Sequence, residues 1–131
     1  MYNPYSLFGK TILVTGASSG IGQATAIECS RMGATLVLTG RNEERLLETY
    51  NSLETEGQVH QIFTADLSSA DGISALVTKL PQLDGCVNNA GIGKTLPIPF
   101  ISWDELDRIY CLNSFAPMLL TKELVRKKKL F

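Results

Sequence analysis

Three glycines and two serines stand close together in the segment TGASSGIG, residues 15–22. At a turn between a strand and a helix, several backbone N–H groups lack a partner within the helix, and the helix dipole favours negative charge. Such a turn suits phosphate or another anion, and hydroxyl groups add further donors. We therefore predict an anion-binding turn formed by Gly16, Ser18, Ser19, Gly20, Ile21 and Gly22.

The three glycines have separate expected roles. Gly16 lets the chain turn sharply off the strand, Gly20 removes a Cβ where the anion approaches, and Gly22 lets the helix pack closely. Their spacing is G-x-x-x-G-x-G, whereas the commonest dinucleotide-binding turn has G-x-G-x-x-G. The alternative that the glycines only make a tight connection stays open, although their position after the first strand favours binding.

Apolar runs alternate with segments of helical periodicity along the rest of the chain, which predicts strands and helices in turn. Asn42, Ser69 (or its neighbour Ser68) and Ser102 suit N-caps, while Gly57 and Pro81 suit helix ends. The expected strands span residues 10–15, 34–39, 59–65 and 83–88, and the expected helices span 20–32, 43–56, 70–80 and 103–129.

This order of elements predicts the fold class. Strands that alternate with helices of this length form βαβ units with a parallel sheet. Right-handed crossovers place helices on both faces of that sheet, so its strands are uniformly apolar. We predict an α/β, Rossmann-type doubly wound sheet of about four strands. A length of 131 residues suits a single domain over 1–131.

Composition argues against several classes of protein. The chain is 44% hydrophobic with a formal net charge of −1, which does not favour nucleic acid as a partner. No apolar run approaches the ~20 residues of a membrane span, and the first residues do not resemble a signal peptide. Cys29, Cys86 and Cys111 are far apart in sequence, so neither disulfides nor a metal site are expected. A reducing, cytoplasmic location is the default expectation.

Two further features have simple structural interpretations. His60, the only histidine, is expected to be a hydrogen-bonded residue within the third strand. The basic run at 126–129 is expected to be a solvated helix end, where cations face the negative end of the helix dipole.

The segment TGASSGIG, together with NNAG at 88–91 and an asparagine on the last long helix, resembles the short-chain dehydrogenase/reductase superfamily. The resemblance covers essentially the whole chain. It implies an oxidoreductase that exchanges hydride between a nicotinamide dinucleotide and a small carbonyl or alcohol, and a strand order of three-two-one-four. It also implies that residues 15–22 seat the diphosphate and that Asn89, Ala90 and Gly91 line the cofactor cleft.

The end of the second expected strand bears on the choice of cofactor. An acidic residue there would bind a ribose 2′-hydroxyl and repel a 2′-phosphate. Here the strand runs into Gly40 and Arg41, and a guanidinium suits a phosphate. We therefore expect NADP(H) rather than NAD(H). The alternatives are that Arg41 stacks on the adenine or pairs with Glu43 or Glu44.

Asp66 and Leu67 follow the third expected strand and match the pair that the family places beside the adenine. The resemblance implies that Asp66 accepts a hydrogen bond from the adenine amino group and that Leu67 supplies an apolar wall. The alternative is that Asp66 is a solvated residue that caps the next helix.

Pro117 lies inside the last long helix, four residues after Asn113. Because proline has no N–H, the carbonyl of Asn113 would be left free to hold a water, and the helix would bend. Asn113 also matches the asparagine of the family's catalytic tetrad, whose main-chain carbonyl is thought to hold a water in a proton relay. We expect Asn113 to be catalytic, with a kink that serves only packing as the alternative.

The other catalytic residues that the resemblance implies are a serine that orients the substrate and a Tyr-x-x-x-Lys pair that exchanges its proton. None of the four tyrosines is followed by lysine four positions later. We therefore expect the cofactor-binding half of an enzyme, inactive alone. A fragment, a premature stop and a natural short form are all open explanations. The alternative function is a non-catalytic nucleotide-binding or interaction module.

Two surfaces predict a homo-oligomer. Without a fifth strand, residues 84–91 would form an open sheet edge with unpaired backbone groups. The last long helix has apolar residues on more than one side, and the resemblance implies that it forms a subunit interface.

Overall fold

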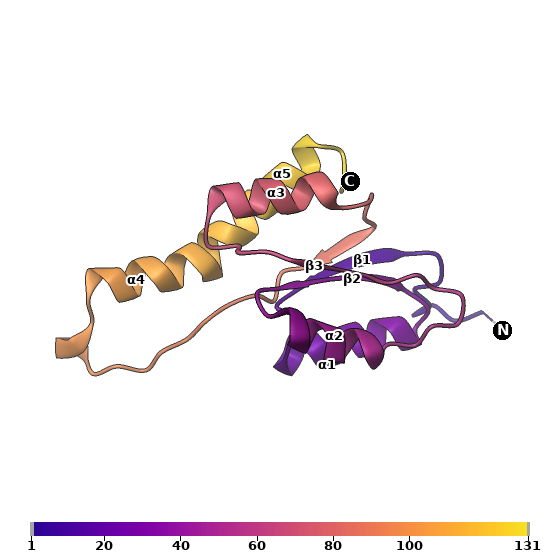
Figure 1. The fold of residues 1–131 in the computed structure, drawn as a ribbon, viewed down its shortest axis with the longest axis horizontal. Coiled ribbons are helices and arrows are strands. Elements are labelled where there is room, and N and C mark those ends of the chain that lie inside the picture. Colours follow the sequence, from indigo (N-terminus) through magenta and orange to yellow (C-terminus); the bar gives the residue numbers. More distant parts are fainter. Residues whose placement is uncertain (1, 131) are drawn as a thin grey trace.

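The computed structural model describes residues 2–130 and has a four-stranded parallel sheet between two layers of helices (Figure 1). The strand order is β3-β2-β1-β4, which confirms the predicted Rossmann-type architecture. The elements in chain order are β1 (Thr11–Thr15), α1 (Gly20–Arg31), β2 (Thr35–Gly40), α2 (Glu43–Asn51), β3 (Gln61–Thr64), α3 (Ala70–Lys79), β4 (Gly85–Val87), the 3-10 turn η1 (Ile98–Phe100), α4 (Trp103–Tyr110), the π-helical turn η2 (Cys111–Phe115) and α5 (Ala116–Arg126).

The sheet brings the carboxyl ends of its strands to one edge. β1 pairs with β2 on one side, where Thr15 is opposite Thr39, and with β4 on the other, where Val14 is opposite Val87. Strands β2 and β3 follow β1 on one side of the sheet, whereas β4 lies on the other side of β1. The strand order therefore reverses between β1 and β4. In open α/β sheets this reversal is where ligands bind.

Helices α1 and α2 cover one face of the sheet, and α3 and α5 cover the other (Figure 1). Because side chains alternate along a strand, β2 contributes to both layers: Leu36 and Leu38 pack on the α1–α2 side and Val37 packs on the α3–α5 side. All three side chains are fully buried. The sequence of β2 is therefore continuously apolar.

Strand β3 is shorter than the expected range of 59–65. The backbone N–H of Leu36, on the neighbouring strand β2, donates to Nδ1 of His60 at 2.9 Å. The imidazole of His60 thus accepts the hydrogen bond that a backbone carbonyl would accept if β3 extended further, so β3 begins at Gln61. His60 is buried and its Nε2 lies 2.6 Å from the Glu54 carbonyl oxygen, so it is hydrogen-bonded as expected, although it precedes the strand.

Two other boundaries differ from expectation. Helix α2 ends at Asn51 rather than before Gly57, because the N–H groups of Ser52 and Leu53 bond carbonyls only three residues earlier. This tighter turn leads into Leu53, which is buried in the core. Strand β4 is only three residues long, Gly85–Val87, instead of six.

The C-terminal helix ends at Arg126, so the prediction of a helix to residue 129 is wrong. The chain then turns through Lys128, which has a positive φ of 56°. The Lys129 carbonyl accepts a hydrogen bond from the N–H of Leu83 at 2.6 Å, and Leu130 forms a parallel bridge with Leu83. The basic run at 126–129 is therefore not simply a helix end, because its last residue pairs with Leu83. The unpaired edge of the sheet begins after Leu83. Among residues 2–130, no helix is both long and apolar enough to span a membrane.

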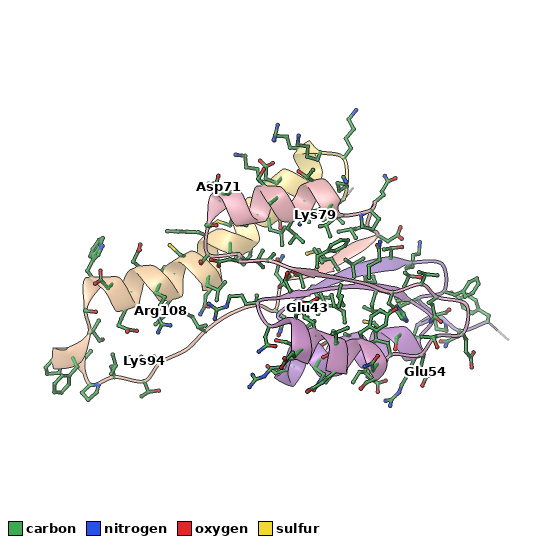
Figure 2. All side chains as sticks on the ribbon, viewed as in Figure 1. Glu43, Glu54, Asp71, Lys79, Lys94 and Arg108 are labelled. Atoms are coloured by element: carbon green, nitrogen blue, oxygen red, sulfur yellow. The ribbon has the colours of Figure 1, made fainter. Side chains whose placement is uncertain are left out.

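The segment between β4 and α5 extends away from the sheet. Residues after β4 run outward to η1, and α4 returns toward the sheet (Figure 1). Figure 2 shows Lys94 on the segment that leads away from β4 and Arg108 on α4. Both side chains form ion pairs with Glu105, at 3.2 and 3.1 Å respectively. The pair of Lys94 with Glu105 ties the two sides of the arm together, whereas the pair of Arg108 with Glu105 lies within α4.

Candidate functional site

A cavity of about 560 Å³ lies at the carboxyl ends of the strands, where the strand order reverses. Its walls come from the turn after β1, the start of α2, the segments after β3 and β4, and η2. Most of the predicted site residues line it: Gly16, Ser18, Ser19, Ile21, Arg41, Leu67, Asn89, Ala90 and Gly91.

The backbone of the glycine-rich turn favours glycine at several positions. Gly16 and Gly20 have φ angles of 63° and 58°, in the left-handed region that favours glycine. A Cβ on Gly22 would lie 2.2 Å from the Gly16 carbonyl oxygen, so α1 begins in direct contact with the turn. Gly20 and Gly22 therefore shape the turn without themselves lining the cavity.

The hydroxyl of Thr15 joins the end of β1 to the segment after β4. It donates to the Val87 carbonyl at 3.3 Å and accepts the N–H groups of Asn89 and Ala90 at 3.0 and 2.9 Å. The side chain of Asn89 in turn donates to the Gly16 carbonyl at 3.1 Å. The glycine-rich turn and residues 89–91 thus form one hydrogen-bonded floor. Thr15 is not among the predicted site residues, although its position at the end of the strand, directly before Gly16, was a visible signal.

The end of β2 and the start of α2 supply the positive charge of the cavity. Arg41 and Arg45 both line it, and neither belongs to the ion pairs found among residues 2–130. The Asn42 side chain caps α2 by accepting the N–H of Arg45 at 3.1 Å. A Cβ on Gly40 would lie 3.5 Å from the Ser18 hydroxyl oxygen, at ordinary van der Waals distance, so the end of β2 lies beside the glycine-rich turn.

Several lining residues were not predicted as site residues: Gly40, Asn42, Arg45, Ala65, Ile92 and Leu112. Arg45 could have been found, because it lies in the first turn of the helix that Asn42 caps and therefore at the same edge of the sheet. Ile92 and Leu112 depend on the fold of the arm, which sequence periodicity does not describe.

Asp66 does not line the cavity, whereas Leu67 does. The Asp66 carboxylate accepts hydrogen bonds from the N–H and the hydroxyl of Ser68 at 2.9 and 2.5 Å. These bonds, and to a lesser extent the charge of Arg41, lower the pKa of Asp66. The residue that caps α3 is Ser69, whose hydroxyl accepts the N–H of Gly72 at 3.0 Å. The Asp66 side chain thus orders the connection from β3 to α3.

Asn113 lies in the π-helical turn η2 rather than in a regular or bent α-helix. The N–H of Ala116 bonds the Cys111 carbonyl five residues earlier, and this wider turn accommodates Pro117. The side chain of Asn113 does not line the cavity, but it bonds the backbone of Ile92, which does. The side chain therefore holds the cavity wall, while the role expected for its main-chain carbonyl stays a prediction.

Residues 2–130 contain no group of three or more His, Cys, Asp or Glu side chains that could hold an ion.

The fold and the cavity together define a Rossmann-type nucleotide-binding protein. The sequence model of the short chain dehydrogenase family matches residues 10–129. The chain therefore belongs to the short-chain dehydrogenase/reductase family, whose members are oxidoreductases.

Individual relatives agree with this assignment. The chain is 36% identical over 123 residues to a glucose 1-dehydrogenase of Gluconobacter oxydans, covering 90% of this chain and 46% of the relative. It is 37% identical over 122 residues to a 3-oxoacyl-[acyl-carrier-protein] reductase of Rickettsia prowazekii, covering 92% and 49%. The chain thus spans about half the length of the curated relatives it matches.

Solved structures show the same architecture. A metagenomic short-chain oxidoreductase in complex with NADP superposes with a TM-score of 0.84 at 34% identity, covering 92% of this chain and 57% of that protein. A short-chain alcohol dehydrogenase from Sinorhizobium meliloti superposes with a TM-score of 0.86 at 29% identity, covering 93% and 50%.

Proposed function

We propose that this chain binds NADP(H) in the cavity and forms the cofactor-binding half of an oxidoreductase that interconverts a small carbonyl compound and an alcohol. The observation that carries this proposal is the position of Arg41. Arg41 lines the cavity directly after β2, next to Gly40, and takes part in none of the ion pairs found among residues 2–130. NADP(H), when bound, supplies or accepts the hydride.

Each wall of the cavity has a role in this proposal. The glycine-rich turn from Gly16 to Gly22 directs N–H groups at the diphosphate, and Gly16, whose φ of 63° favours glycine, places this backbone beside the cavity. Arg41 binds the 2′-phosphate through a charge-assisted, forked contact. Leu67 and Ala90 form the apolar walls, and the carbonyl of Asn113 holds a water in the proton relay.

Proton exchange with the substrate requires more than these residues. The sequence contains no tyrosine followed by lysine four positions later, and the chain spans about half of its relatives. We propose that residues 1–131 form one cofactor-binding unit that does not catalyse the reaction alone. The proposed location is a reducing, cytoplasmic compartment, in keeping with the three free cysteines.

The test is a fluorescence titration of the purified chain with NADPH and with NADH. We expect tighter binding of NADPH, and we expect Arg41→Ala to weaken NADPH binding by about tenfold while NADH binding changes little. The matched control is Arg31→Ala, which removes an equal charge at the far end of α1, where Arg31 pairs with Glu28. A chain that binds neither nucleotide, or that binds both equally before and after Arg41→Ala, would falsify the assignment.

We also propose that the chain self-associates through the helical segment formed by α4, η2 and α5. Its large apolar side chains Tyr110, Phe115 and Met118 are 55%, 49% and 61% exposed. Exposed apolar surface of this kind marks interaction sites. Sedimentation velocity at increasing concentration tests this proposal, and a monomer at every concentration would contradict it.

A further inference from the structure

Thr49 is a fully buried polar residue in α2 that does not line the cavity. Its hydroxyl donates to the carbonyl of Ala17 at 2.8 Å. It also accepts a hydrogen bond from the side-chain amide of Gln23 in α1 at 3.1 Å. One hydroxyl therefore connects α1, α2 and the glycine-rich turn.

This arrangement differs from that of an ordinary helical threonine. Thr25 in α1 and Thr78 in α3 donate to the carbonyl four residues earlier in their own helices, at 2.7 and 2.9 Å. The corresponding distance from Thr49 to the Arg45 carbonyl is 3.3 Å, longer than its 2.8 Å bond to Ala17. The Thr49 hydroxyl thus bonds the turn in preference to its own helix.

The two bonds to Ala17 fix the direction of the next amide. The Ala17 N–H donates to the Thr39 carbonyl at 3.2 Å, and its carbonyl is held by Thr49. The described residues have no cis peptide bonds, and in a trans peptide the C=O and the following N–H point in opposite directions. Holding the Ala17 carbonyl toward α2 therefore turns the N–H of Ser18 away from α2. Ser18 lines the cavity.

We infer that Thr49 is a positioning residue that preorganises the glycine-rich turn for the cofactor diphosphate. The inference rests on the proposed function, because it concerns how that same cavity binds its nucleotide. Thr49 does not line the cavity and acts only through Ala17. Without its hydroxyl, the Ala17 carbonyl loses a partner in a buried place, and the peptide that precedes Ser18 is free to rotate.

The test compares two nucleotides, of which only one has a diphosphate that can contact the glycine-rich turn. NADPH carries the diphosphate, whereas 2′-AMP carries only the adenosine and the 2′-phosphate. We expect Thr49→Val to weaken NADPH binding by about tenfold and to change 2′-AMP binding by less than about twofold. Thr49→Ser, which keeps the hydroxyl, should restore NADPH binding to within about twofold. Thr78→Val serves as the control for removing a helical hydroxyl elsewhere, and should change neither affinity.

The outcomes separate this inference from the proposed function. Unchanged NADPH affinity in Thr49→Val, or an equal loss for both nucleotides, overturns the positioning role and leaves the NADP(H) proposal intact. Failure of the unmodified chain to bind NADPH overturns the proposed function instead.

Amide hydrogen exchange of the nucleotide-free chain tests the positioning role without any ligand. Faster exchange confined to residues 17–23 in Thr49→Val, and absent in Thr49→Ser, supports it. Unaltered exchange in that segment, or acceleration throughout the chain, overturns it.

Discussion

The side-chain amide of Asn113 bonds both backbone groups of Ile92. The Ile92 N–H donates to Asn113 Oδ1 at 2.8 Å, and Asn113 Nδ2 donates to the Ile92 carbonyl at 2.7 Å. A residue on a neighbouring antiparallel β-strand would pair with Ile92 through the same two backbone groups. One side chain in η2 therefore fixes the first residues of the arm beside the cavity.

Replacing Asn113 by alanine removes both bonds at once. We expect Asn113→Ala to lower the free energy of unfolding by about 1 kcal/mol, since both bonds are solvent-exposed and an exposed hydrogen bond contributes modestly. The N–H of Ile92 should exchange with solvent faster, as measured by NMR. Ser114→Ala is the neighbouring control. An unchanged exchange rate at Ile92 would show that the arm is held by other contacts.

The close contact at Gly22 predicts a large effect of a single methyl group. Gly22→Ala places a Cβ 2.2 Å from the Gly16 carbonyl oxygen and 2.4 Å from Asn89 Nδ2. The backbone must shift, so we expect a loss of about 3 kcal/mol in urea unfolding. Gly93→Ala is the matched control, because its Cβ would have no atom within 4 Å. Equal stability of the two variants would contradict the observed packing of α1 on the turn.

Helix α5 packs through one face. Leu120 is 1% exposed in the core beneath α3, whereas the adjacent Leu119 is 39% exposed. We expect Leu120→Ala to cost about 3 kcal/mol of unfolding free energy and Leu119→Ala to cost less than about 1 kcal/mol. Chemical denaturation of both variants measures this difference. Similar losses would mean that the helix is rotated relative to the structure.

Burial raises the pKa of the Cys86 thiol in β4 to about 11. Only the thiolate reacts with iodoacetamide, so the native chain should be alkylated slowly at pH 8, with a rate that rises with pH until the thiol titrates. Unfolding in urea lowers the pKa toward its ordinary value, and we expect alkylation at pH 8 to become about a hundredfold faster. Mass spectrometry of the Cys86 peptide measures both rates. Equal rates in the native and unfolded chains would contradict the burial.

The sequence predicted the elements that depend on local pattern. The uniformly apolar residues of β1 and β2 indicated strands buried on both faces, and the side chains of Asn42, Ser69 and Ser102 cap the helices that they were expected to cap. The glycine-rich turn was found because glycine at these spacings has no use in a regular helix or strand.

The parts that the sequence did not predict depend on contacts between distant segments. The bond from Leu36 to His60 sets the start of β3 across 24 residues. The bond from Thr49 to Ala17 links positions 32 residues apart. Neither periodicity nor spacing indicates such pairs. From the sequence alone, His60 could equally be an ordinary strand residue, and the Thr49 hydroxyl could equally bond a carbonyl of its own helix.

The π-helical turn η2 contains more backbone per turn than the α-helices on either side of it. Each residue of an α-helix advances the rotation by about 100°. A π-helical turn needs more residues to complete the same rotation, so a regular α-helix with the same number of residues between Tyr110 and Ala116 would turn Leu120 and Leu124 about the helix axis and out of the core. The turn thus sets the phase between α4, which has no buried residue, and α5, which buries Ala116, Leu120 and Leu124. Any insertion or deletion in this short segment has to preserve that phase, whatever side chains it carries.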